Sequence, residues 1–169
     1  EAYTIDPAKL VTDREIAYHI NRNELEVTEA GMQLAKIYGD RDLLVAESLR
    51  AGIWNDLDAA TLSAIVASLV YESRRDDEGS QPKLPKGKFL DVLHQTDDLW
   101  AALETAAKKH KLKGTEPLDP GVSFAVHRWV SGGRLDSVLF ESDMLVGDFI
   151  RLSKQIIDLH REGSPINLG

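Results

Sequence analysis

Apolar residues recur at helical spacing along most of the chain. The clearest case follows Asp58, where steps of three and four place five residues on one stripe of a helix: Leu62, Ile65, Val66, Leu69 and Val70. Asp58 is a residue type that caps helix N-termini, so a helix over 58–70 is predicted. We find no convincing alternation with the period of two that marks half-buried strands. The pattern therefore predicts an all-α fold.

Start and stop signals extend this pattern to a compact multi-helix bundle of about seven helices. Asp119–Pro120 is a strong start signal, and Gly132–Gly133 is the matching stop. Gly52 suits the left-handed position that follows a helix end. The other predicted helices, with Thr28 and Asp40 as the caps of the first two, cover residues 28–38, 40–50, 89–110, 135–140 and 142–161.

The chain divides into three predicted parts. Residues 1–26 are polar and weakly periodic, with one short amphipathic helix expected over 13–23, and the chain begins with Glu1 rather than Met. We interpret them as a connecting segment from an upstream domain of a longer polypeptide. Residues 27–162 form the helical bundle, interrupted by an exposed loop over 73–88 that holds two Pro and two Gly. Residues 163–169 are predicted to be a flexible tail.

Composition limits the function classes. The 169 residues weigh 18.8 kDa, about one domain, and contain no Cys, which excludes disulfides and thiolate metal sites and favours a reducing, cytoplasmic location. The net charge of −8 argues against nucleic-acid binding through bulk electrostatics, so any such contact must be local. No apolar run approaches the roughly 20 residues that span a bilayer, so no membrane partner is expected.

Catalytic and cofactor motifs are missing from the sequence. No GxxxxGK[ST] loop is present, and no Gly pair stands between a strand and a helix as a dinucleotide site requires. The stretch around Ser123 lacks the second Gly of a nucleophile elbow. The five His residues are scattered, and Asp91 and His94 have no third ligand nearby in sequence. We therefore predict no catalytic residue, no metal ligand and no cofactor in this chain.

The last predicted helix carries an organised polar surface. One side holds an apolar stripe of Leu145, Phe149, Leu152, Ile156 and Leu159. The other side presents a polar row about 15 Å long, formed by Arg151, Lys154, Gln155, Asp158 and Arg161. These side chains suit contacts with bases and phosphates, although a solvated helix face explains the spacing as well. A second basic cluster, Lys108–Lys113, ends a helix where the backbone dipole favours positive charge, and we interpret it as structural or solvated.

Several motifs together resemble a known family. They are Val27–Thr28, Ala35–Tyr38, Asp42–Arg50, Leu57–Leu62, Leu69–Asp77, His127–Trp129 and, most specifically, Gly147–Leu159 (GDFIRLSKQIIDL). The chain resembles, over about residues 27–160, the DSHCT domain, the C-terminal helical bundle of superkiller-type superfamily-two RNA helicases in its bacterial HelY-like form.

This resemblance implies an accessory domain that packs on the RecA-like domains of the same polypeptide and lines the channel for single-stranded RNA. Those domains would bind ATP and Mg²⁺. The Gly147–Leu159 stretch corresponds to the family's ratchet helix, so the resemblance implies that Arg151 and Gln155 face the RNA bases, with Asp158 one turn further on and Lys154 flanking. Eukaryotic relatives tend to have Arg at the position of Gln155.

The C-terminal end departs from the family pattern, because Pro165 stops the helix that normally continues there. Apolar surface left uncovered by this change would favour self-association. A different class of function also remains open: a protein-interaction helical bundle with no nucleic-acid role, in which the last helix or the region of Trp54 docks a partner.

Overall fold

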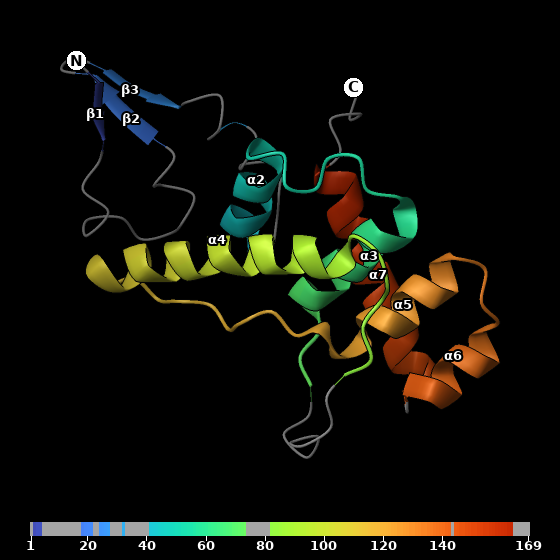
Figure 1. Ribbon diagram of the computed structural model, residues 1–169. Helices are drawn as coiled ribbons and strands as arrows, with labels where there is room; N and C mark the ends of the chain where they lie inside the picture. The colour runs from blue at the N-terminus through green and yellow to red at the C-terminus, as the bar shows by residue number, and fades with distance from the viewer. Residues whose placement is uncertain are drawn as a thin grey trace. The chain divides into compact units, whose positions relative to one another are not determined.

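The protein is described by a computed structural model that covers residues 2–4, 18–21, 24–27, 32, 41–73, 82–142 and 144–163 (Figure 1). The chain divides into two compact units, one of residues 1–53, 96–116 and 162–169, the other of residues 54–95 and 117–161. Six α-helices and a 3₁₀-helix (η4) lie in the described part: α2 (Asp42–Arg50), α3 (Ala59–Val70), α4 (Phe89–Lys109), η4 (Pro120–Val122), α5 (Ser123–Val130), α6 (Leu135–Ser142) and α7 (Val146–Gly163).

The all-α class is confirmed, with six helices in the described residues rather than about seven. The helix predicted over 28–38 lies outside the described residues except for Met32. The first 27 residues differ from the prediction, because three short antiparallel strands form a sheet there in the order β1 (Ala2–Thr4), β2 (Tyr18–Asn21), β3 (Glu24–Val27). Strands of three or four residues are too short for their alternation to be recognised, and the helix expected over 13–23 is wrong at Tyr18–Asn21.

Helix α2 lies in the first unit and buries Leu44, Val45 and Ser48. It ends as predicted at Gly52, whose φ is +70°, and the N–H of Ile53 reaches back to the carbonyl of Ser48 at 3.1 Å. Its N-cap position is held by Arg41, whose side chain makes no cap bond, while the predicted cap Asp40 lies outside the described residues.

Helix α3 is the centre of the second unit. It begins as predicted, with Asp58 accepting the N–H of Thr61 at 2.9 Å. A single apolar stripe was expected, yet the small residues between its members are buried too, among them Ala64, Ala67 and Ser68. They let α5 pack closely against α3, and the buried Ser123 hydroxyl donates to the carbonyl of Ala64 at 2.8 Å. Ser123 thus has a structural role.

Asp119 joins the end of α3 to the start of η4. Its carboxylate accepts the N–H of Gly121 at 2.9 Å and that of Ser73 at 2.7 Å, and its own N–H donates to the carbonyl of Ser68. The predicted Asp119–Pro120 start is therefore confirmed, and the same side chain fixes the chain that leaves α3. The predicted stop is confirmed as well, since Gly132 has a φ of +93°.

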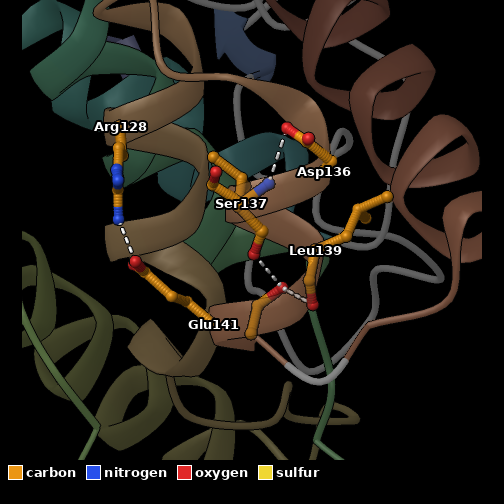
Figure 2. Close-up of polar contacts among 7 residues, drawn as sticks. Arg128, Asp136, Ser137, Leu139 and Glu141 are labelled. Atoms are coloured by element: carbon orange, nitrogen blue, oxygen red, sulfur yellow. Dashed lines mark hydrogen bonds and ion pairs between the residues drawn. The ribbon is translucent and has the colours of Figure 1, made fainter.

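Helices α6 and α7 meet at a different place from that predicted. Ser142 was expected to begin the last helix, but its hydroxyl donates to the carbonyl of Val138 at 2.8 Å and so belongs to the last turn of α6. An ion pair between Arg128 and Glu141 joins α5 to α6 (Figure 2). None of the helices in the described ranges is long and apolar enough to cross a membrane.

Candidate nucleic-acid interface

Helix α7 is held in the second unit by one buried face. Phe149, Leu152 and Ile156 join a core cluster with side chains of α3, η4, α5 and α6, and Leu159 packs at its edge. The ring of Phe149 also meets that of Trp129 edge to face, with centroids 5.2 Å apart. The predicted apolar stripe is therefore confirmed at these four positions. It is wrong at Leu145, which is 68% exposed because the chain enters α7 one residue later.

A flank of α7 next to this buried face borders an open hollow of about 250 Å³ in the second unit, and Leu152 belongs to both. Three segments supply its walls: the end of α3, the connection from α6 to α7, and the first turns of α7. We call it the α7 hollow, and its lining residues are Val70, Tyr71, Glu72, Ser142, Met144, Leu145, Asp148, Arg151, Leu152 and Gln155. Its volume is below the roughly 300–1,000 Å³ of pockets that enclose drug-sized ligands. It is therefore too small and too open to enclose such a ligand.

The walls of the α7 hollow combine apolar and polar chemistry. Met144 and Leu145 offer apolar contact, Tyr71 an aromatic ring, and Arg151 and Gln155 a guanidinium and an amide. Guanidinium and aromatic planes stack on bases, and an amide can donate to and accept from a base edge. Glu72 and Asp148 add two carboxylates to the same lining.

Arg151 is positioned by Asp148, one turn earlier in α7. Its Nη2 donates to Oδ1 of Asp148 at 2.6 Å, while the Arg151 side chain stays 73% exposed. An ion pair this exposed contributes roughly 0–1 kcal/mol. The pair therefore points the guanidinium toward the α7 hollow at little cost, and a phosphate or base can replace Asp148 as its partner.

The four predicted contact residues separate into two groups. Arg151 and Gln155 line the α7 hollow together, one turn apart. Lys154 and Asp158 are exposed on the same helix but do not line it. Helical geometry places Lys154 nearer to Arg151 than to the core face, so these two side chains continue the polar row beyond the hollow.

Sequence reasoning missed the wall contributed by α3. Tyr71 and Glu72 fall within the Leu69–Asp77 motif that carries the resemblance, but nothing in their spacing relates them to a helix about 80 residues further on. Their placement depends on Asp119, which holds Ser73 and Gly121, and a Cβ on Gly121 would lie 3.2 Å from the Tyr71 ring. The absence of a side chain at residue 121 thus leaves room for that ring.

Shifted pKa values in the second unit mark caps and ion pairs. The N–H of Thr61 lowers the pKa of the Asp58 carboxyl, and Arg128 lowers the pKa of Glu141. Burial lowers the pKa of His160, whose Nε2 is enclosed without a hydrogen-bond partner among the described residues. Residues with shifted pKa values often mark catalytic sites, but these three shifts come from a helix cap, an ion pair and burial. None of these three residues lines the α7 hollow.

In the alternative docking region around Trp54, the indole itself does not offer an exposed anchor to a partner. Trp54 is 7% exposed and belongs to the buried residues of the chain. A protein partner would need the large apolar side chains that are exposed elsewhere in the second unit, of which Phe140 at 90% is the extreme.

Comparison with known proteins gives the family. The model of the DSHCT (NUC185) domain matches residues 24–164. The chain is 35% identical to the probable helicase HelY of Mycobacterium tuberculosis over 143 residues, and equally to that of Mycobacterium leprae over 144, covering 79% of this chain and 16% of each relative. It is 30% identical to the Arabidopsis thaliana protein named DExH-box ATP-dependent RNA helicase DExH15 chloroplastic, over 76% of this chain and 11% of that protein.

The chain thus spans about a sixth or less of the length of these relatives. Its match to the family model covers most of its residues, including the whole of α2 to α7 and the α7 hollow. We conclude that this chain belongs to the DSHCT (NUC185) domain family.

Proposed function

We propose that this domain is an accessory part of an ATP-dependent RNA helicase, and that α7 guides single-stranded RNA along its polar face. The observation that carries the proposal is the α7 hollow, where Arg151 and Gln155 meet Tyr71 and Glu72 in a domain whose relatives are named helicases. The domain packs on RecA-like domains of the same polypeptide. Those domains bind ATP and Mg²⁺ and hydrolyse the ATP, and the whole protein works in the cytoplasm.

The chemistry of the hollow suits transient contact with one base at a time. Its open side lets a base enter and leave, Arg151 stacks on the base or bonds to it, and the Gln155 amide reaches its edge. Such contacts involve the base faces and edges that single-stranded RNA exposes and that paired RNA conceals. Lys154 and Asp158 contact the neighbouring nucleotides.

The domain contributes to strand movement without a catalytic group of its own. ATP-driven motion of the RecA-like domains moves the RNA, and α7 resists backward slipping by holding the bases in turn. The net charge of −8 keeps the affinity of the isolated domain for RNA low, because one short polar row supplies few phosphate contacts.

The test uses the full-length protein that contains this domain, with Arg151→Glu as the variant. We expect a tenfold or greater loss of the unwinding rate on an RNA duplex with a single-stranded tail, and unchanged ATP binding measured with a fluorescent nucleotide. Arg134→Glu is the matched control, since Arg134 is an exposed arginine of the same unit that pairs with a nearby Asp, Asp136, and lies outside the hollow.

Two outcomes would contradict the proposal. The first is an unwinding rate that Arg151→Glu leaves unchanged. The second is an equal loss in both variants, which would indicate a general effect of the two-unit change in charge. Crosslinking of single-stranded RNA to the full-length protein should identify peptides of α7 and of the Val70–Glu72 segment.

A protein-interaction helical bundle with no nucleic-acid role is the second candidate. Exposed apolar side chains of α6, α7 and the connection between them favour it, since Phe140, Leu145 and Ile157 are 90%, 68% and 51% exposed. They also support self-association of this chain. Under this alternative, Phe140→Ser abolishes dimer formation in sedimentation experiments, and no RNA crosslinks to α7.

A further inference from the structure

Four lysines lie together at the C-terminal end of α4, and no carboxylate among the described residues pairs with them. Lys108 and Lys109 close the helix, and Lys111 and Lys113 follow in the next turn, all four exposed. Within the described ranges none of these ammonium groups has a carboxylate partner, whereas Arg50, Arg128, Arg134 and Arg151 are each paired with one. We call the four lysines and the backbone of residues 108–115 the lysine turn.

The helix dipole accounts for only part of this charge. The C-terminal end of a helix carries the equivalent of about −0.5 charge, whereas four ammonium groups bring four positive charges. The first unit also holds Glu104 one turn before Lys108, and its carboxylate lies at the turn: Oε1 accepts the N–H of Thr115 at 2.7 Å and its hydroxyl at 3.0 Å. This one negative charge and the helix dipole offset less than half of the four positive charges, and the remainder is left for a ligand from solution.

The lysine turn has a defined backbone. Lys111 has a φ of +58°, and the N–H of Leu112 reaches back to the carbonyl of Ala107 at 2.9 Å, which closes α4. The far end is tied by Thr115, whose hydroxyl accepts the Nε1–H of Trp100 at 3.0 Å and donates to Glu104. Binding therefore has to order the lysine side chains but not the backbone, which lowers its entropic cost.

The chemistry favours phosphate over a protein partner. Protein interfaces are depleted in Lys and depend on buried aromatic or apolar anchors. The apolar residue of the segment 108–113 is Leu112, and it is half-buried. Lysine ammonium groups bind phosphate as point charges, without the planar geometry that selects a particular base.

We propose that the lysine turn binds the sugar-phosphate backbone of single-stranded RNA without sequence preference. The inference rests on the proposed function, which brings RNA to this domain, and it adds a second contact of different chemistry. Arg151 and Gln155 contact bases, whereas the lysine turn neutralises phosphates. Each phosphate neutralised on a single strand lowers the slope of log K against log salt by about 0.7.

The experiment measures binding of fluorescein-labelled oligouridine to the full-length protein by anisotropy over a series of KCl concentrations. Lys109→Gln with Lys111→Gln is the test variant. Lys86→Gln with Lys88→Gln, at two exposed lysines that precede α4, makes the same change in charge and is the control. We expect the test pair to lower the magnitude of the salt slope by about 1.4 and to weaken binding about tenfold at low salt. The control pair should change the slope by less than 0.3.

The outcomes separate this inference from the proposed function. Equal slopes in the test and control pairs would overturn the lysine turn alone, provided that Arg151→Glu still slows unwinding. Failure of the wild-type protein to bind oligouridine would overturn both. A test pair that binds oligouridine normally but loses binding to poly-L-glutamate would also overturn the inference, and would assign the turn to an acidic protein. Lys108→Gln with Lys113→Gln, which leaves the left-handed residue unchanged, gives a second pair with the same expected result.

Discussion

The α7 hollow and the lysine turn both present basic side chains, but they differ in how the charge is held. In the hollow, Arg151 is paired with Asp148 and set among Tyr71, Met144 and Gln155, on a helix fixed by a buried face. In the turn, four exposed lysines have no carboxylate partner in the described residues. The comparison shows that packing of α7 against the core fixes the position of the Arg151 side chain. The lysine turn, in contrast, needs only the closed C-terminal end of α4 to present its positive charges.

Under the two proposals above, an acidic chain binds a polyanion at two places. The hollow then contacts bases through side chains that are held in position, and the turn attracts phosphates without selecting a sequence. Substitutions in the two regions should therefore change different observables, and the following variants test that separation in order of expected effect on stability.

The largest effect is expected at Leu152, which lines the α7 hollow and is also 4% exposed in the core. Leu152→Ala should lower the free energy of unfolding of this chain by about 2–5 kcal/mol, because it leaves a cavity under α7. Urea denaturation, monitored by circular dichroism, measures this change in the free energy of unfolding. The control Ile150→Ala, at an exposed position of the same helix, should change stability by less than about 0.5 kcal/mol. Equal effects would show that α7 is not held by this face.

Asp119→Ala should have the next largest effect. It removes the acceptor of two backbone N–H groups, those of Ser73 and Gly121, and we expect a loss of about 1–2 kcal/mol. The wall formed by Tyr71 and Glu72 should also loosen, so RNA crosslinking to this segment falls in the full-length protein. Asp119→Asn keeps one acceptor oxygen and should recover part of the stability. If Asp119→Ala unfolds at the same urea concentration as the wild type, the position of Tyr71 and Glu72 does not depend on the hydrogen bonds of Asp119.

Acidification should lower the free energy of unfolding through His160, which lies on α7. Burial lowers the pKa of this imidazole in the folded chain, so the folded state binds fewer protons than the unfolded state below pH about 6.5. The stability from the neutral ring is therefore present above that pH, and it is lost as the pH falls toward the lower folded pKa. His160→Gln should flatten the dependence of the unfolding free energy between pH 7 and about 5. A dependence on pH that His160→Gln leaves unchanged would contradict this role of the buried imidazole.

The smallest effect is expected in the lysine turn itself. Lys111→Gly removes a side chain from a left-handed backbone position, where Gly is the preferred residue after a helix. We expect stability to rise by up to about 1 kcal/mol, seen as a higher melting temperature, while RNA binding weakens. Lys113→Gly, which lacks the positive φ, should weaken RNA binding without a rise in stability. A melting temperature lowered by Lys111→Gly would argue that the lysine side chain supports the turn.

Local signals allowed much of the second unit to be predicted. Asp58, Asp119 and Gly132 act through bonds or dihedral angles within a few residues, so their sequence context suffices. The buried face of α7 follows from helical spacing. The strands at the N-terminus are determined by pairing with partners up to 19 residues away, such as Ala2 with Asn21, and such short segments have no periodicity of their own.

The sequence predicted only the α7 residues of the candidate site. Arg151 and Gln155 share a helix face, and spacing alone places them together. Tyr71 and Glu72 reach them through the packing of α3 and the bonds of Asp119, which no local pattern encodes. Exposure also depends on neighbours: Leu145 fits the apolar stripe by spacing but lies just before the first turn of α7, where no other element covers it.

The edge-to-face contact of Trp129 with Phe149 gives the protein an optical reporter of α7. Trp129 lies on α5 and is 36% exposed, so part of its indole is shielded from water by the ring that α7 supplies. If α7 leaves the bundle, the indole becomes fully hydrated and its emission shifts to longer wavelength. In a chain whose other two tryptophans, Trp54 and Trp100, are replaced by Phe, fluorescence would follow the detachment of α7 on the timescale on which it occurs.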